Sequence, residues 1–365
     1  MKLVLFSDLH LDTVFAWTED VAVARKFRDA LRAALLKTLQ LATSTEADAI
    51  LCAGDLYEHD RFSPDTQAFL SRCFAEVDLP VVIAPGNHDW YGPASIYRSA
   101  RWSPNVHIFS TSRLEPLELA DGLTLWGAAH CAPAGTEGFL RDFRVNRGGV
   151  NLALFHGSER SFLAQQGDKK MPHAPFDAEE IERAGLQHAF VGHYHCPRDG
   201  EWHTYPGNPE FLSFGETGER GPVVVTIHRD GTIERERHHV AAMRVHDIVV
   251  DVTGCSDRQD VLDRTEKQIA GLDGIARITL TGEMAAEVDV RINDLKEIHS
   301  SLETSIVRFS NLRVAYDFLA IQKEPTVRGQ FVRDVLAASL GEVEQRRILV
   351  TGLRALDGRD DLEVA

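Results

Sequence analysis

Five short segments of the chain carry Asp, Asn or His side chains that together can bind divalent metal ions. The segments are Asp8-Leu9-His10, Gly54-Asp55, Gly86-Asn87-His88-Asp89, Phe155-His156-Gly157 and Gly192-His193-Tyr194-His195. Each follows a short apolar run, which indicates a loop at the end of a buried strand. Two divalent ions held about 3.5–4 Å apart drive in-line attack on phosphorus. The pattern therefore predicts hydrolysis of a phosphoester.

The donor types favour transition metals. Asp8 and Asp55 offer carboxylates, and Asp55, which stands alone in its loop, is the better candidate to bridge two ions. Asn87 offers a neutral carbonyl oxygen. Imidazole nitrogens suit Mn, Fe or Zn better than Mg or Ca, and they are supplied by His10, His156, His193 and His195. A single D-x-H motif is uninformative, but all five segments in this order are hard to explain by chance.

Strands with intervening helices must position these loops. Apolar runs predict strands over 2–7, 49–53, 80–84, 106–109, 123–127, 150–155 and 188–191. A helix over 19–42 is predicted with Thr18 as its cap, and Ser63-Pro64 predicts the start of another. Because a rigid sheet fixes the loops that follow its strands, the order indicates a layered α/β or α+β core.

The pattern changes near residue 240. Strands are predicted over 245–252, 275–281 and 306–316, helices over 256–270 and 292–302, and helical structure over 325–357. We therefore expect three parts: a phosphoesterase domain over 1–238, a small α+β domain over 239–322 and a C-terminal helical segment over 323–365. The apolar side chains of the last segment either pack on their own domain or contact a partner; they are Phe331, Val335, Leu336, Ile348 and Leu353.

Composition and charge limit the setting. Apolar residues form 44% and charged residues 26% of the 365 residues, which is ordinary for a globular protein. We expect no transmembrane helix, because no run of about 18 apolar residues occurs, and no secretory signal. Five scattered cysteines without a C-x-x-C pair favour reduced thiols and a cytoplasmic protein. The net charge of −16 is awkward for a nucleic-acid enzyme.

The ordered motifs resemble the calcineurin-like metallophosphoesterase superfamily over roughly residues 1–235, and more specifically the SbcD-type DNA repair exonucleases of the meiotic-recombination nuclease family. Two later segments are also similar to that family: Tyr205-Pro206-Gly207-Asn208-Pro209 and Leu212-Ser213-Phe214-Gly215-Glu216. The resemblance implies an α+β fold: a four-layer α/β/β/α sandwich, followed by a small α+β capping domain that positions DNA and a C-terminal helical segment.

The resemblance also implies roles for the motif residues. One metal would be bound by Asp8, His10, Asp55 and His195, and the other by Asp55, Asn87, His156 and His193. His88 would be the histidine that meets the scissile phosphate without binding metal, and Asp89 would orient His88 or its loop. The ions would be two Mn²⁺, with Fe, Zn or Mg as substitutes.

The activity implied is that of a DNA nuclease subunit, an exonuclease with or without endonuclease activity, that acts in repair or recombination through a water activated by two metals. The partners implied are DNA and an SMC-like coiled-coil ATPase of the SbcC type, with a homodimer inside the complex and no membrane. The C-terminal helical segment would dock on the ATPase.

One position departs from the family. Many relatives place a histidine three residues after the bridging Asp, where this chain has Glu58, followed by His59. Either His59 takes the place of the family histidine through a shifted loop, or the influence of that histidine on nuclease action is absent. In the second case His59 is a solvent-facing loop residue. His130 is a second candidate at the pocket edge, with packing as its alternative. Arg141 and Arg144 either contact substrate or form a solvated face.

Two other functions remain open. The first is a phosphodiesterase or phosphatase for a substrate other than DNA, which the charge of −16 favours and the extra module disfavours. The second is a non-catalytic assembly subunit on a hydrolase fold, against which the complete ligand set argues.

Overall fold

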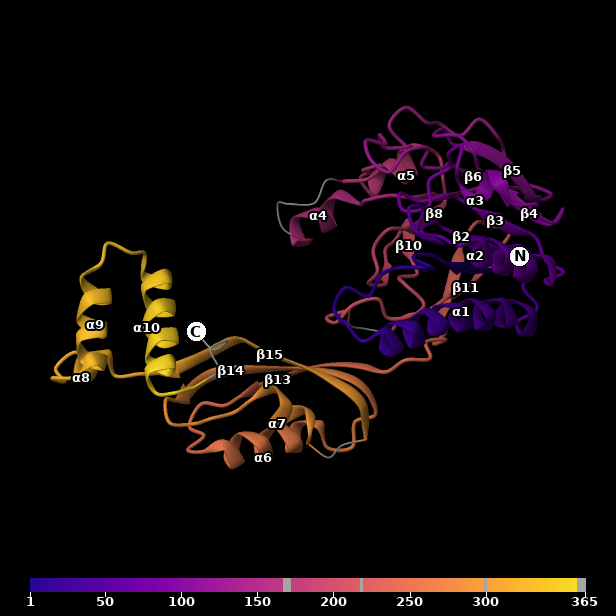
Figure 1. Ribbon diagram of the computed structural model, residues 1–365. Helices are drawn as coiled ribbons and strands as arrows, with labels where there is room; N and C mark the ends of the chain where they lie inside the picture. Colours follow the sequence, from indigo (N-terminus) through magenta and orange to yellow (C-terminus); the bar gives the residue numbers. More distant parts are fainter. Residues whose placement is uncertain (167–171, 217–218, 299–300, 360–365) are drawn as a thin grey trace. The chain divides into compact units, whose positions relative to one another are not determined.

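The computed structural model describes residues 1–166, 172–216, 219–298 and 301–359. The chain divides into two compact units, Met1–Met243 and Arg244–Ala365, whose elements are drawn in Figure 1. In the described ranges, none of the helices combines the length and the apolar character needed to cross a bilayer.

The first unit contains, in its described part, two six-stranded sheets. The first sheet has the order β12-β11-β1-β2-β3-β4, with β1 to β4 parallel and β11 antiparallel to both β1 and β12. Its strands are β1 (Lys2–Phe6), β2 (Ala49–Cys52), β3 (Val81–Ile83), β4 (Val106–Ile108), β11 (Val223–Ile227) and β12 (Ile233–Arg237).

The second sheet has the order β5-β6-β7-β8-β10-β9. Strands β6, β7, β8 and β10 are parallel, and β5 and β9 pair antiparallel at its edges. Its strands are β5 (Glu115–Ala120), β6 (Leu123–Gly127), β7 (Val150–His156), β8 (His188–Gly192), β9 (Arg198–Asp199) and β10 (His203–Tyr205).

The two sheets face each other across one apolar core, to which the first contributes Leu3 and Leu51 and the second Leu125, Leu154 and Phe190. Helix α1 (Val21–Ser44) packs on β1 and β2, and α2 (Pro64–Ala75) follows β2. The outer side of the second sheet packs with the short α5 (Glu179–Arg183). Two further short helices are α3 (Ile96–Ser99) and α4 (Arg160–Gln166). The predicted four-layer α/β/β/α sandwich is confirmed.

The helix starts follow from capping side chains. Ser63 caps α2 by accepting a hydrogen bond from the Thr66 amide, with Pro64 next, as predicted. The prediction of Thr18 as the cap of α1 is wrong, because the carboxylate of Asp20 accepts the first free amides of the helix. Thr18 instead accepts a hydrogen bond from the Asp20 amide.

The second unit is built on a parallel sheet of three strands, β13 (Val245–Asp251), β14 (Gly274–Ala285) and β15 (Leu302–Ala315). The helices between them are α6 (Arg258–Ile269) and α7 (Ile292–Lys296). The predicted β-α-β-α-β order is therefore present. The predicted boundary at 302–306 is wrong, since α7 ends at Lys296 and the strand already begins at Leu302.

The C-terminal helices share the core of this second unit. They are α8 (Phe318–Ile321), α9 (Val327–Ala337) and α10 (Glu342–Leu356), and α9 and α10 lie side by side (Figure 1). Of the candidate partner contacts, Leu353 is fully buried there, and Phe331 and Val335 pack against the same core. Leu336 and Ile348 are each 37% exposed.

Truncating Leu353 therefore should destabilise the second unit. We expect Leu353→Ala to lower the free energy of unfolding by about 2–5 kcal/mol, because it leaves a cavity in a closed core. Ile348→Ala on the same helix is the control and should cost well under half as much. Urea unfolding followed by circular dichroism measures both variants, and equal losses would contradict the placement of Leu353 in the core.

Candidate metal centre

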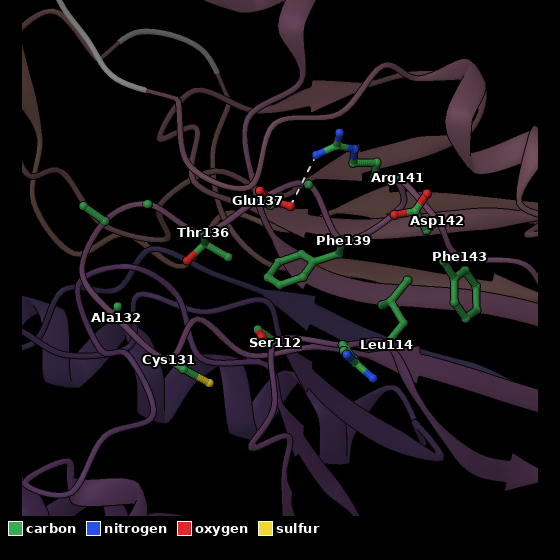
Figure 2. A pocket seen from close by; sticks show the side chains of 14 residues that line it. Ser112, Leu114, Cys131, Ala132, Thr136, Glu137, Phe139, Arg141, Asp142 and Phe143 are labelled. Carbon is green, nitrogen blue, oxygen red and sulfur yellow. Dashed lines mark hydrogen bonds and ion pairs between the residues drawn. The ribbon is translucent and has the colours of Figure 1, made fainter.

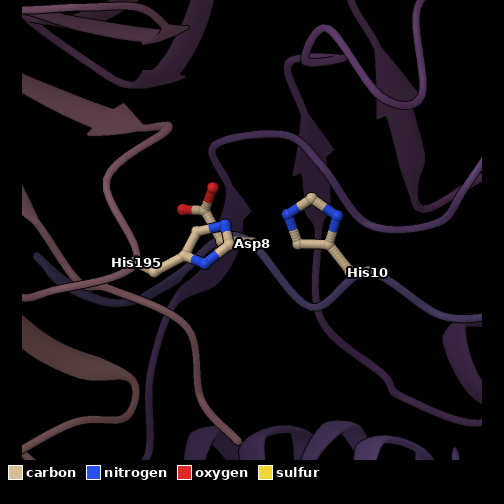
Figure 3. A group of neighbouring side chains, drawn as sticks. All are labelled: Asp8, His10 and His195. Atoms are coloured by element: carbon tan, nitrogen blue, oxygen red, sulfur yellow. The ribbon is translucent and has the colours of Figure 1, made fainter. Parts of the chain in front are cut away.

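The predicted ligands come together at the carboxyl ends of parallel strands from both sheets. Asp8 and His10 follow β1, Asp55 follows β2 and Asn87 follows β3. The second sheet contributes His156, the last residue of β7, and the residues after β8, His193 and His195. Figure 3 shows the side chains of Asp8 and His10, from the loop after β1, close to that of His195, from the loop after β8. The assignment of these residues as metal ligands stays a prediction.

The backbone turns sharply where these side chains leave the strands. Asp8, His10, Asp55 and His193 have φ values of 54°, 50°, 52° and 116°, a region that residues other than glycine rarely occupy. Gly54 has φ 93°, and a Cβ there would lie 2.7 Å from the Gly86 amide nitrogen. The unusual conformations therefore concentrate in the ligand loops.

Ligand atoms form three overlapping groups, each with its members within 4.8 Å of one another: Asp8, His10 and His195; Asp8, Asp55 and His156; and His10, Asp55 and His88. Between individual atoms, Nε2 of His156 lies 3.2 Å from Oδ2 of Asp55 and 3.1 Å from Oδ1 of Asn87. Nε2 of His10 lies 3.6 Å from the same Asp55 oxygen. Asp8, His10 and Asp55 each belong to two of these groups, and a carboxylate shared in this way can bridge two ions.

Three of the histidines are oriented through Nδ1. His10 donates to Glu58 Oε1 at 2.7 Å, His195 to Glu216 Oε1 at 2.9 Å, and His156 to the Ala53 carbonyl at 2.9 Å. An imidazole that donates through Nδ1 keeps its lone pair on Nε2, which is the arrangement found for histidines that bind metals.

The electrostatics of the centre depend on close pairing of opposite charges. Burial alone would raise the pKa of Asp55, but the charge and hydrogen bond of His156 hold the pKa well below its usual value. Burial lowers the pKa of His193, so this imidazole is neutral. A neutral imidazole and an ionised carboxylate are the protonation states that bind a metal ion.

The residues fit a pair of divalent cations. Asp8 and Asp55 are 0% and 1% exposed, and buried carboxylates require a paired or coordinating partner. Nε2 of His10 is buried and has no hydrogen-bond partner among the described residues. Carboxylate, amide and imidazole donors that surround these atoms suit a transition metal.

Glu58 is a functional residue that the sequence prediction missed. Its carboxylate, 17% exposed, accepts from Nδ1 of His10 and, at 3.0 Å, from Nδ1 of His88. That hydrogen bond raises the pKa of His88 to about 9, so the imidazole is protonated at neutral pH. The only signal of this role in the sequence was that Glu58 stands where many relatives have a histidine.

Asp89 holds the loop backbone around the centre. It is 0% exposed and accepts hydrogen bonds from the amides of Asp55, Gly86 and Leu56 and from the Tyr97 hydroxyl. Burial raises the pKa of Asp89 to about 6. These contacts tie the loop after β2 to the loop after β3, and Asp89 therefore positions both Asp55 and Asn87.

The segment around Glu216 supports His195 from behind. Besides His195, the Glu216 carboxylate accepts from the Leu212 amide at 3.0 Å and from Asn208 Nδ2 at 2.8 Å. The buried Arg220 contacts the Asn208 side chain and the Glu216 carbonyl, and its guanidinium lies 4.1 Å from the Phe211 ring centroid. The family-like segment thus builds the support of one predicted ligand.

A cavity of about 720 Å³ opens on the centre and is lined by several predicted residues, including His88, together with Glu58 and Glu216. Its lining also contains residues that the sequence prediction left out, among them His173, Tyr194 and Arg198. The His173 ring lies 5.4 Å from the His193 ring, and its buried Nδ1 has no hydrogen-bond partner in the described chain.

Four predicted substrate residues lie elsewhere. The His59 ring lies against Trp90, with 3.8 Å between the ring centroids and the rings tilted by 31°. The buried His130 donates to the His156 carbonyl at 2.8 Å. Arg141 lines a second cavity of about 800 Å³ together with Phe139 and Cys131 (Figure 2), and Arg144 is exposed. The described lining of the metal-centre cavity includes none of the four.

Two facing sheets whose strand ends carry a shared carboxylate and several oriented histidines define a metal-dependent phosphoesterase. Residues 1–197 match the calcineurin-like phosphoesterase family, which is more than half of the 365-residue chain. The chain belongs to this family, whose members use two metal ions.

The chain is also similar to individual proteins and solved structures. The chain is 25% identical over 285 residues to the uncharacterized metallophosphoesterase YhaO of Bacillus subtilis (strain 168), covering 73% of this chain and 67% of that protein. It is similar to the solved structure of TT1561 of Thermus thermophilus, with TM-score 0.37 and 16% identity over 65% of this chain and 98% of that one. The E. coli phosphoesterase Yfce gives TM-score 0.28 and 15% identity, with 66% and 100% covered.

Metal binding should stabilise the first unit. Because the centre exists only in the folded state, Mn²⁺ at a hundred times its dissociation constant should add about 2.7 kcal/mol to the free energy of unfolding. Thermal unfolding with EDTA and with excess Mn²⁺ measures this gain as a rise in Tm. Asp55→Asn should lose most of it, and an identical Tm with and without Mn²⁺ would contradict the metal centre.

Removing the His173 side chain should weaken substrate binding more than turnover. We expect His173→Ala to raise KM for an aryl phosphodiester about threefold to tenfold, with kcat nearly unchanged. This is the loss of binding free energy expected when one hydrogen bond to the substrate is removed. Arg141→Ala, in the other cavity, is the control and should leave KM unchanged. Steady-state kinetics with saturating Mn²⁺ decide this, and a large fall in kcat alone would contradict a role in binding.

Proposed function

We propose that this chain is a Mn²⁺-dependent DNA nuclease subunit that hydrolyses phosphodiester bonds as an exonuclease, with or without endonuclease activity, in DNA repair or recombination. The observation that carries the hydrolytic part is His88. Its side chain is 46% exposed in the cavity, immediately beside the donor cluster, and its Nδ1 is held by Glu58. The remaining nitrogen, Nε2, is therefore available to a substrate.

The residues divide the chemistry between them. When bound, two divalent cations neutralise phosphate charge and lower the pKa of a coordinated water. His88 supplies the proton or hydrogen bond that the leaving oxygen needs, a role worth about 10²–10⁴ in rate. Asp89 and Glu216 touch no substrate and position the loops around the centre.

Support for DNA as the substrate comes from the family-like segment of residues 205–216. This part of the SbcD-type resemblance is built into the centre, since Asn208 and Leu212 hydrogen-bond to Glu216, the partner of His195. The resemblance of the second unit to a capping domain points the same way. The imidazole-rich donor set suits Mn²⁺, with Fe or Zn as substitutes.

The partner we propose is an SMC-like coiled-coil ATPase of the SbcC type. Because Leu353 is buried, the docking surface on α9 and α10 would use Leu336 and Ile348, which are exposed. Co-expression and co-purification of this chain with an SbcC-type ATPase tests the pairing. Loss of the complex in Leu336→Asp with Ile348→Asp would support this surface.

A second candidate is a phosphodiesterase for a substrate other than DNA. The net charge of −16 favours it, because DNA binding rests largely on Lys and Arg. The same metals and His88 would serve this reaction.

One paired assay separates the two candidates. Purified protein with Mn²⁺ should shorten linear DNA and also cleave bis-p-nitrophenyl phosphate, whereas cleavage of the small diester alone would support the second candidate. His88→Ala should lower kcat about 10²–10⁴-fold while its Mn²⁺ stoichiometry, measured by calorimetry, stays unchanged. Undiminished turnover in this variant would contradict the role of His88.

A further inference from the structure

We propose that Glu58 is a shared positioning residue, whose single carboxylate fixes both the predicted metal ligand His10 and the substrate-facing His88. Oε1 accepts from His10 at 2.7 Å, and Oε2 accepts from His88 at 3.0 Å. The two rings meet edge to face, with 4.8 Å between their centroids. The inference rests on the proposed function of this same centre.

The arrangement needs both carboxylate oxygens. Each imidazole donates its Nδ1 proton to a different oxygen, so one side chain sets the ring orientation of both histidines and the tautomer of His10. Nε2 of His10 is then directed toward Asp55, 3.6 Å away. Glu58 therefore couples the orientation of the predicted metal ligand His10 to that of His88, which faces the leaving group.

The backbone holds Glu58 in place. Its amide donates to the Leu11 carbonyl at 2.9 Å, and its carbonyl accepts from the amides of Arg61 and Phe62. The next amide, of His59, donates to the His88 carbonyl at 2.9 Å. The loop after β2 is thereby tied to both loops whose histidines Glu58 contacts, which limits how far any of the three can move independently.

Glu216 provides a matched comparison within the same centre. Its Oε1 accepts from His195 at 2.9 Å, and its other oxygen is bonded to Asn208 and Leu212. Both glutamates therefore orient a predicted metal ligand, but of the two, Glu58 is the one that also contacts His88.

The first test measures metal binding without turnover. Isothermal titration of metal-free protein with Mn²⁺ should show affinity about 10–100-fold weaker in Glu58→Ala and in Glu216→Ala, the usual effect of losing a residue behind a metal ligand. His88→Ala should bind Mn²⁺ like the wild type. Circular dichroism melts confirm that each variant is folded.

The second test measures the dependence of kcat on the leaving group at saturating Mn²⁺. In a series of aryl methyl phosphodiesters, log kcat is plotted against the pKa of the leaving phenol. We expect Glu58→Ala and His88→Ala to lower kcat most for the phenols of highest pKa, which steepens the slope. Glu216→Ala should keep the wild-type slope. Glu58→Gln has one acceptor oxygen and can hold only one histidine, so it should recover one of the two properties and lose the other.

The outcomes separate this inference from the function it rests on. Wild-type Mn²⁺ affinity and slope in Glu58→Ala, or an equal change of slope in Glu216→Ala, would overturn the shared role while leaving the hydrolase intact. A wild-type protein that binds Mn²⁺ but cleaves none of the diesters would overturn the proposed function instead. The titration arm would still report on the Glu58–His10 pair.

Discussion

Two carboxylates buried side by side are the constraint on which the first unit is organised. Asp8 and Asp55 are almost inaccessible to solvent, and a buried charge is costly unless it is paired or coordinates a cation. Hydrogen bonds and charge pairing with the neighbouring imidazoles offset part of the free energy lost when the carboxylates are buried. Metal ions bound by these donors would offset the rest. Sheet order follows from the same need, because parallel strands β1, β2 and β3 bring their carboxyl ends to one edge.

The ligand loops are strained, and the rest of the unit stabilises them. Each non-glycine residue in a sparsely populated backbone region costs about 1–3 kcal/mol, and Asp8, His10, Asp55 and His193 all have positive φ. Such conformations persist only where neighbouring structure determines them. Here Asp89 binds three loop amides, and the apolar core between the two sheets fixes the strands from which the loops leave.

The sequence predicted the ligand loops because their signal is local: an apolar run followed at once by Asp, Asn or His. The strands and most helices were predictable for the same reason. The side chains that accept from the histidine Nδ1 atoms were not predictable. Glu58 lies 48 residues from His10 and Glu216 lies 21 residues from His195, and no local sequence pattern links either pair. His173 was not predicted to line the metal-centre cavity, and Arg141, predicted as a substrate contact, lines another cavity. Tertiary packing decides which loop residues line one cavity, and no local pattern reports it.

The pairing of these glutamates changes what the net charge means for the substrate. A charge of −16 predicts repulsion of a polyanion, yet the acidic residues that line the metal-centre cavity are Asp55, Glu58 and Glu216, and each is paired with a histidine. Burial would raise the pKa of Glu58, but the hydrogen bonds from His10 and His88 lower it to about 2. A phosphate group that entered this cavity would therefore meet the paired histidines and Arg198, and the net charge of the whole chain is a poor guide to this local charge.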